Sequence, residues 1–428
     1  MANPPETDAH LDSQTKPSFL KTLGPGLVTG AADDDPSGIA TYSQVGAQFG
    51  YGLSWSMLFI FPFMVVIQEI AARIGCVTGR GIAQNLRRHY SPWLLRSVVG
   101  LLLVANVINL GSDLGAMAAS LALLIGGPVH VYAVLFGLLC VSLEIVIPYE
   151  RYATVLKWMT LSLFAYVAVV FTVHVPWSEA LLSTIVPRFV FDSAHATAIV
   201  AIFGTTISPY LFFWQAGQEV EEQHRRHAKA LCVSPRNAGA QFARIRTDTL
   251  VGMGVSHLVA LFIIIATAAT LHANGITNIE TSAQAAQALR PIAGDLSFAL
   301  FAAGVIGTGM LAVPVLAGSA AYAVAEVFQW PEGLDRRPRE AKAFYGTIAV
   351  ATLAGAALNF TSLDPIKALY WSAVVNGVLA APLMAVMVMI AVNPRIMGRF
   401  TLSRPMIIGG WLATGVMTMA SLMFFLSL

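Results

Sequence analysis

Three consecutive carboxylates and a proline interrupt an apolar stretch that runs from Gly24 to Ala47. The interruption reads Asp-Asp-Asp-Pro-Ser-Gly at residues 33–38. Carboxylates are costly at membrane depth and usually face a water-filled path or bind an ion there. Pro36 lacks an N–H and its ring clashes with the preceding turn, so we expect the helix to break and to leave carbonyls near Ala32 unpaired. Open carbonyls beside a carboxylate predict a cation site.

The composition indicates an all-α polytopic membrane protein. Of 428 residues, 56% are hydrophobic and 11% are charged, and the mean hydropathy is +0.69. A helix needs about 20 apolar residues to cross a hydrocarbon core of roughly 30 Å. We expect eleven spans, at residues 24–47, 52–75, 94–125, 129–147, 153–173, 196–216, 250–271, 296–327, 344–358, 366–392 and 406–428.

The basic residues predict the orientation of the chain. With a cytoplasmic N-terminus, 22 of the 25 Lys and Arg residues fall in cytoplasmic segments, and only Arg188, Arg290 and Lys367 fall outside. The positive-inside rule therefore favours a cytoplasmic N-terminus and, with eleven spans, an extracytoplasmic C-terminus. Orientation also accounts for the arginines of segment 73–96, so we expect the lipid bilayer and no nucleic acid as a partner.

A second break is predicted in the sixth span, where residues 204–210 read Gly-Thr-Thr-Ile-Ser-Pro-Tyr. A single proline in a membrane helix usually means only a kink. Breaks in the first span of two successive groups of five, however, are typical of inverted repeats with a binding site at the bilayer midplane. The residues expected at the two breaks are Pro36, Ser37, Gly38, Gly204 and Pro209.

These repeats divide the chain into five predicted parts. Residues 1–18 are expected to form a cytoplasmic tail, because they lack the pattern of a signal peptide. The first five-helix repeat is expected at 19–174, an extracellular connection at 175–195, the second, inverted repeat at 196–392, and a cytoplasmic loop with the eleventh helix at 393–428.

The sequence around both breaks resembles the Nramp metal-ion transporters. The resemblance rests on Gly-Pro-Gly at 24–26, Asp-Pro-Ser-Gly at 35–38, Gly-Ala-Gln-Phe-Gly-Tyr at 46–51, and Ala-Ala-Arg-Ile-Gly at 71–75 followed by Val-Thr-Gly at 77–79. It implies a LeuT-like inverted-repeat fold in a prokaryotic inner membrane, with a divalent cation as the transported substrate. No cofactor other than the transported ion is expected.

The resemblance also implies a set of metal ligands, some of which are replaced in this chain. Nramp proteins carry Asp-Pro-Gly-Asn in span 1 and Met-Pro-His in span 6, and their Asp, Asn, Met sulfur and nearby carbonyls bind a transition metal. Asp35 and the carbonyls of Ala32 and Thr205 carry over to this sequence. Gly38 stands in place of the Asn, and Ser208 stands in place of the Met.

Loss of the Met sulfur changes the expected ion. Soft sulfur favours manganese, iron or cadmium over magnesium and calcium, whereas Ser208 and Thr205 offer hard oxygen. The missing side chain at Gly38 leaves space, and Mg²⁺ commonly keeps several of its waters. The pattern is similar to that of the prokaryotic Nramp-related magnesium transporters. We therefore expect Mg²⁺ as the main substrate and Mn²⁺ as a second one, with Ca²⁺ also compatible with oxygen ligands.

Residues that the resemblance associates with proton coupling are changed as well. Tyr210 occupies the position of the family's His, Ala116 and Asn106 replace acidic residues in span 3, and only Asp113 is retained there. Span 9 lacks the arginines of the family's proton pathway. We predict facilitated transport by alternating access without obligate proton coupling. The expected residues around the site or the pathway are Asp34, Asn106, Asp113, Tyr210 and Asn376.

Two other polar positions have structural interpretations. Glu69 precedes Arg73 by four residues, a spacing that favours an ion pair over a substrate contact. His257 in span 7 is more typical of an interhelical hydrogen bond than of a transport path.

Two alternative functions stay open. One is a proton-coupled Mn²⁺/Fe²⁺ symporter of the Nramp type, and the other is an amino-acid or organic-solute transporter on the same helical plan. Three adjacent acids disfavour an anionic substrate. We do not expect an enzyme, because His-Glu-X-X-His, Gly-X-Ser-X-Gly and phosphate-loop motifs are absent from the sequence.

Overall fold

A computed structural model describes residues 25–147, 163–190, 192–235, 237–361 and 364–427. The predicted tail at 1–18 lies outside the described residues, as does the first half of the predicted fifth span. Every regular element of the described chain is helical. Eight helical stretches within it are long and apolar enough to cross a membrane.

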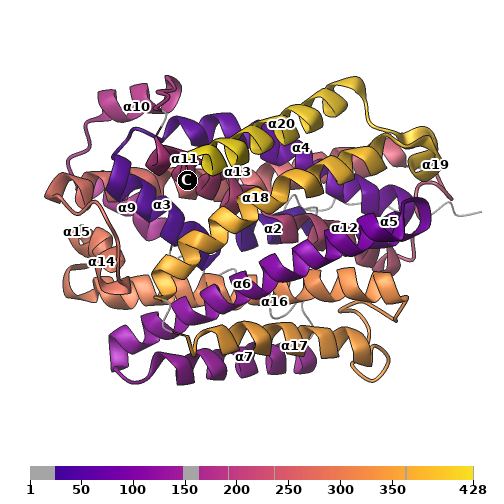
Figure 1. The fold of residues 1–428 in the computed structure, drawn as a ribbon, viewed down its shortest axis with the longest axis horizontal. Helices are drawn as coiled ribbons and strands as arrows, with labels where there is room; N and C mark the ends of the chain where they lie inside the picture. The colour runs from indigo at the N-terminus through magenta and orange to yellow at the C-terminus, as the bar shows by residue number, and fades with distance from the viewer. Residues whose placement is uncertain (1–24, 148–162, 191, 236, 362–363, 428) are drawn as a thin grey trace, which may run out of the picture.

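The elements before residue 190 contain the first break and its neighbours (Figure 1). They are α2 (Pro25–Asp33), α3 (Pro36–Phe49), α4 (Trp55–Thr78), α5 (Ile82–His89), α6 (Pro92–Ile125), α7 (Val129–Val146), α9 (Phe164–Thr172) and α10 (Trp177–Ile185).

The elements after residue 192 contain the second break. They are α11 (Ser193–Thr206), α12 (Pro209–Arg225), α13 (Ala238–Thr270), α14 (Ser282–Ala286), α15 (Arg290–Ala293), α16 (Ser297–Phe328), α17 (Lys342–Leu358), α18 (Pro365–Val392), α19 (Pro394–Met397) and α20 (Arg404–Ser427). Short 3₁₀ turns flank several of them.

Local sequence explains where these helices begin. Asp35, Ser91, Asp192 and Asp364 each cap a helix by accepting a hydrogen bond from a backbone N–H of its first turn.

Two helices, α12 and α13, extend well beyond the predicted spans 6 and 7. Charged residues can continue a helix outside the membrane, so apolar length alone underestimated both of them.

Both predicted breaks are present. Helix α2 ends at Asp33 and α3 begins at Pro36, while α11 ends at Thr206 and α12 begins at Pro209. Each proline is the first residue of the second half-helix, where its missing N–H costs no intrahelical hydrogen bond. The chain therefore restarts a helix immediately after each opening.

Small residues let the half-helices approach their neighbours closely. A Cβ on Gly204 of α11 would lie 1.9 Å from the Ala373 carbonyl oxygen of α18. A Cβ on Gly30 of α2 would lie 2.3 Å from the Gly252 carbonyl oxygen of α13. Membrane helices pack through such small residues because apolar burial alone does not drive their association in lipid.

Two further predicted contacts are confirmed. Arg73 Nη2 and Glu69 Oε1 lie 2.5 Å apart as an ion pair within α4. The Nε2 atom of His257 lies 2.5 Å from the Met57 carbonyl oxygen, which joins α13 to α4.

The crossing of α11 and α18 yields a stability prediction. We expect Gly204→Ala to lower the free energy of unfolding by about 2 kcal/mol or more, because the added methyl group overlaps backbone. The matched control is Gly415→Ala in α20, where an added Cβ meets no protein atom within 4 Å and stability should be unchanged or slightly higher. Melting of the two purified variants in the same detergent checks this, and equal melting temperatures would contradict the packing interpretation.

Candidate functional site

Asp35 lies at the first break, and its two carboxylate oxygens differ in how many hydrogen bonds they already accept. Its Oδ1 accepts hydrogen bonds from the Gly38 N–H and the Ser37 hydroxyl, both at 2.7 Å. Its Oδ2 accepts only the Tyr210 hydroxyl, at 3.1 Å, among the hydrogen bonds of the described chain. Oδ1 is thus committed to capping α3, whereas Oδ2 points to the second broken helix.

Tyr210 links both halves of the site. Its side chain is fully buried, and its hydroxyl lies 3.3 Å from the Ala32 carbonyl oxygen as well as 3.1 Å from Asp35 Oδ2. The predicted ligands Asp35 and Ala32 therefore lie close together, bridged by the residue that occupies the family's His position.

The second break contributes hydroxyl groups and carbonyls. The Ser208 hydroxyl lies 2.8 Å from the carbonyl oxygens of both Gly204 and Thr205, so it caps the carbonyls that the break exposes. The Thr205 hydroxyl lies 3.4 Å from the Ser37 hydroxyl. The two breaks thus meet through oxygen atoms from Ser37, Thr205 and Asp35.

Free space beside Gly38 was expected and is not what the structure shows. A Cβ at Gly38 would lie 3.3 Å from Thr205 Oγ1 and 3.4 Å from the Asp33 carbonyl oxygen. Groups of both breaks therefore occupy the expected room.

Ser256 of α13 is a site residue that the sequence did not reveal. Its hydroxyl lies 2.9 Å from Asp33 Oδ2 and 3.0 Å from Asp34 Oδ1. The expected pathway residue Asp34 is therefore held with Asp33 against α13. The only available signal was a serine next to His257, and many apolar helices contain a serine that bonds its own backbone.

Asp113 of α6 is completely buried beside this cluster. Its carboxylate interacts electrostatically with Asp35, and neither of its oxygens has a hydrogen-bond partner in the described structure. Within the same described part, no Lys or Arg forms an ion pair with any of these acids. Buried carboxylates need a compensating charge, and a bound cation can supply it.

The other two predicted pathway residues, Asn106 and Asn376, make no hydrogen bond to Asp35 in the described chain. Asn106 donates to the Leu316 carbonyl at 2.9 Å and to the Ser319 hydroxyl at 2.6 Å, so it ties α6 to α16. Asn376 is buried in α18, next to the close contact between Gly377 and Gly204.

Comparison with known proteins agrees with this geometry. The family model Nramp, described as natural resistance-associated macrophage protein-like, matches residues 26–427. The chain belongs to the Nramp family. Among curated relatives, the divalent metal cation transporter MntH of Verminephrobacter eiseniae is 28% identical over 301 residues, or 68% of this chain and 65% of that protein. The MntH of Klebsiella pneumoniae is 25% identical over 407 residues, or 93% of this chain and 92% of that protein.

Solved structures show that this Nramp chain has the predicted LeuT-like fold. A manganese transporter from Eremococcus coleocola gives a TM-score of 0.72 at 16% identity, over 98% of this chain and 88% of that one. The transporter MhsT, solved with L-phenylalanine, gives 0.61 at 13% identity, over 94% and 98%. The prediction of an all-α, LeuT-like fold with helix breaks before Pro36 and Pro209 is confirmed.

A narrow route approaches the site from the end of the bundle that carries α10, α14 and α15 (Figure 1). A cavity of about 210 Å³ is lined there by polar side chains that include Gln44, Gln48 and Asn278. It shares Ile279 and Ile366 with an apolar cavity of only about 10 Å³ that reaches Pro36. That volume is close to one water, so apolar side chains close this route beside the first break.

The opposite end of the bundle, here named the basic end, carries α5, α19 and the loops at 226–237 and 329–341. Helix α2 is held there by a hydrogen bond of 2.7 Å from the Gly26 N–H to Asp248 Oδ2. The Thr29 hydroxyl also donates to Gln215 Oε1 of α12 at 2.5 Å. From Pro209 to Glu219, α12 is buried at every residue. The site is therefore closed toward the basic end.

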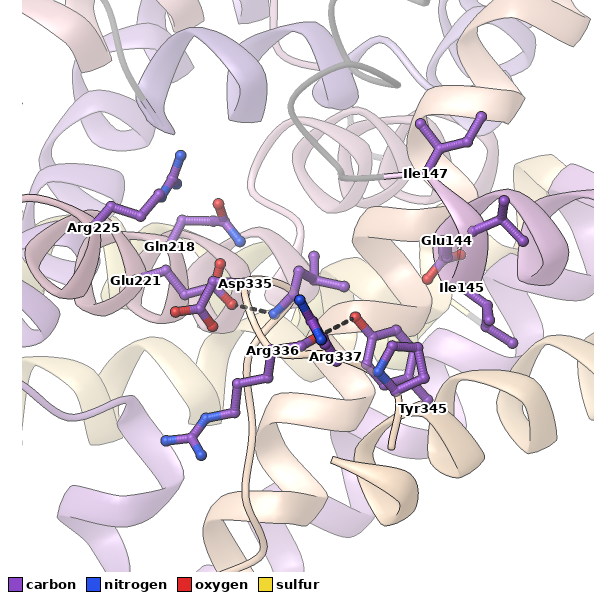
Figure 2. A pocket seen from close by; sticks show the side chains of 13 residues that line it. Glu144, Ile145, Ile147, Gln218, Glu221, Arg225, Asp335, Arg336, Arg337 and Tyr345 are labelled. Carbon is purple, nitrogen blue, oxygen red and sulfur yellow. Dashed lines mark hydrogen bonds between the residues drawn. The ribbon is translucent and has the colours of Figure 1, made fainter. Parts of the chain in front are cut away.

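A cavity of about 320 Å³ opens at the basic end (Figure 2). In this view Glu221 and Arg225 of α12 lie on one side, and Glu144 and Tyr345 lie on the other. Glu221 accepts a hydrogen bond from the Leu334 N–H at 2.6 Å and another from Tyr322. These bonds hold the loop between α16 and α17 against the second half-helix.

This loop yields a pH prediction. Burial, reinforced by the charge of Glu221, raises the pKa of Glu332 to about 7. Between about pH 4.5 and pH 7, the Glu332 carboxyl keeps its proton in the folded protein but loses it in the unfolded chain. The buried carboxyl therefore lowers the free energy of unfolding more and more as the pH rises through this range. We expect Glu332→Gln to leave stability unchanged at pH 4.5 and to raise it by about 1–2 kcal/mol at pH 8.

Melting temperatures at both pH values check this, with Glu340→Gln on the same loop as the control because Glu340 is exposed. If Glu332→Gln shifts the melting temperature equally at the two pH values, the buried carboxyl is not responsible.

Proposed function

We propose that this protein is a divalent-cation transporter whose main substrate is Mg²⁺, with Mn²⁺ as a second substrate, and that it works without obligate proton coupling. The observation that carries the proposal is the cluster of buried carboxylates at the first break, to which the described chain supplies no basic counter-charge. Membership of the Nramp family and relatives named as divalent metal cation transporters support a divalent ion.

The chemistry of the site favours a hard ion. The groups that meet at the two breaks are the Asp35 carboxylate, the Ala32 carbonyl, and the hydroxyls of Ser37, Thr205 and Tyr210. Oxygen ligands suit Mg²⁺, Ca²⁺ and Mn²⁺, whereas sulfur and imidazole would favour softer transition metals. Mg²⁺ also keeps water ligands readily, which suits a site with few protein ligands.

Transport without a proton is supported by the same residues. Tyr210 donates its hydroxyl hydrogen to Asp35 at a position where an imidazole would exchange protons near neutral pH. Asn106, in place of an acid, is bonded between helices. The membrane potential supplies about 2.3 kcal/mol per charge per 100 mV, or roughly twice that for a divalent cation, which is enough to drive uptake.

The orientation belongs to the same proposal. The basic end of the bundle would face the cytoplasm, as the positive-inside rule requires, and the inner membrane would be the location. The repeats would then be 19–174 and 196–392, joined on the outside by 175–195, and residues 393–428 would hold a cytoplasmic loop and the eleventh helix. In this orientation the apolar constriction at Pro36 lies on the outer route.

Flux in proteoliposomes tests the proposal. With an inside-negative potential, we expect uptake of Mg²⁺ without acidification of the lumen, and a loss of at least about tenfold in Asp35→Ala, because this change removes a direct carboxylate ligand. Internal indicators for Mg²⁺ and for pH, read on the same vesicles, give both quantities. Asp295→Ala is the matched control, since Asp295 is an exposed acid remote from the breaks.

The other outcomes identify the alternatives. Manganese uptake with acidification and no magnesium flux would assign the protein to the proton-coupled symporters. Absence of any Asp35-dependent divalent flux, together with saturable uptake of an amino acid, would favour an organic substrate.

A further inference from the structure

Tyr210 occupies the space between two expected cation ligands. Its hydroxyl oxygen lies 3.1 Å from Asp35 Oδ2 and 3.3 Å from the Ala32 carbonyl oxygen. A phenol has one hydrogen to donate, so it satisfies one of these acceptors at a time. Asp35 Oδ1 already accepts the Gly38 N–H and the Ser37 hydroxyl, which leaves Oδ2 as the oxygen that a cation would bind.

The spacing of these oxygens matches a metal coordination shell. Octahedral Mg²⁺ has oxygen ligands at 2.0–2.1 Å, which places neighbouring ligand oxygens about 3.0 Å apart. The Tyr210 oxygen lies close to that distance from both Asp35 Oδ2 and the Ala32 oxygen. An ion bound to those two atoms would therefore have the tyrosine oxygen within reach as a third ligand, provided that the hydroxyl hydrogen turned away from it.

We propose that Tyr210 is a direct oxygen ligand of the transported divalent cation, and that cation binding turns its hydroxyl hydrogen away from Asp35. The inference rests on the proposed function of the Asp35 site and adds one ligand to it. In the empty site the hydroxyl stabilises Asp35 in place of the ion. In the loaded site the same oxygen coordinates the ion.

The variant Tyr210→Phe tests whether the hydroxyl coordinates the ion or only competes with it for Asp35. If the hydroxyl only competes with the ion for Asp35, its removal leaves cation affinity unchanged or raises it. If it is a ligand, we expect Tyr210→Phe to weaken Mg²⁺ and Mn²⁺ binding about tenfold, measured by calorimetry on the full-length protein. Tyr166→Phe is the matched control, because Tyr166 is an equally buried tyrosine on α9.

The number of water molecules on the bound ion is a second measurement, which a general structural defect would not change. Water fills a vacated position on a hydrated divalent ion, so Mn²⁺ bound to Tyr210→Phe should carry one more exchangeable water than Mn²⁺ bound to the parent protein. Electron spin resonance in ¹⁷O-enriched water counts these ligands. An unchanged count would overturn the proposal.

Asp35→Ala separates failure of this inference from failure of the proposed function. If the parent protein binds no divalent cation, or binds it as well with Asp35→Ala, the proposed function itself is wrong. If binding depends on Asp35 but is unaffected by Tyr210→Phe, only the role of Tyr210 is wrong.

Discussion

Buried carboxyl groups inside an apolar bundle are the constraint on which the rest of the structure depends. Asp33, Asp34, Asp35 and Asp113 are all buried, and within the described part of the chain none of them forms an ion pair. Such an arrangement is stable only where hydrogen bonds share the charge and an ion or water can enter. The broken helices provide both, because the first opening frees backbone groups beside Asp33, Asp34 and Asp35, and the second brings hydroxyl groups to them.

The structure satisfies most of the backbone groups that the breaks expose. Asp35 caps the restarted helix α3, and Ser208 bonds the Gly204 and Thr205 carbonyls. The Tyr42 hydroxyl lies 3.0 Å from the Thr206 hydroxyl, which joins α3 to the end of α11. Polar groups left without partners would cost stability in lipid, so this network lets the chain keep two unwound segments without unfolding the bundle.

The sequence predicted the fold well because its strongest signals are local. Apolar length located the membrane helices, and Pro36 and Pro209 located both breaks to the residue. Contacts between distant segments were harder. Ser256 could not be assigned to Asp33 and Asp34 before the packing of α13 on α2 was known, and the space vacated at Gly38 could not be known to close. Spacing along a chain reports which groups are present, whereas packing decides which of them meet.

The residues that differ from the Nramp pattern all change which protein atoms can contact an ion at the site. Replacing Met by Ser208 removes sulfur, and replacing Asn by Gly38 removes an amide oxygen, so fewer protein atoms can contact an ion. Tyr210 brings an oxygen to the same place, at 3.1 Å from Asp35. A site with one carboxylate, few carbonyls and a phenol leaves coordination positions to water, and hydrated Mg²⁺ tolerates that better than ions that prefer full dehydration or soft donors. Selectivity would then come from how many waters the ion retains.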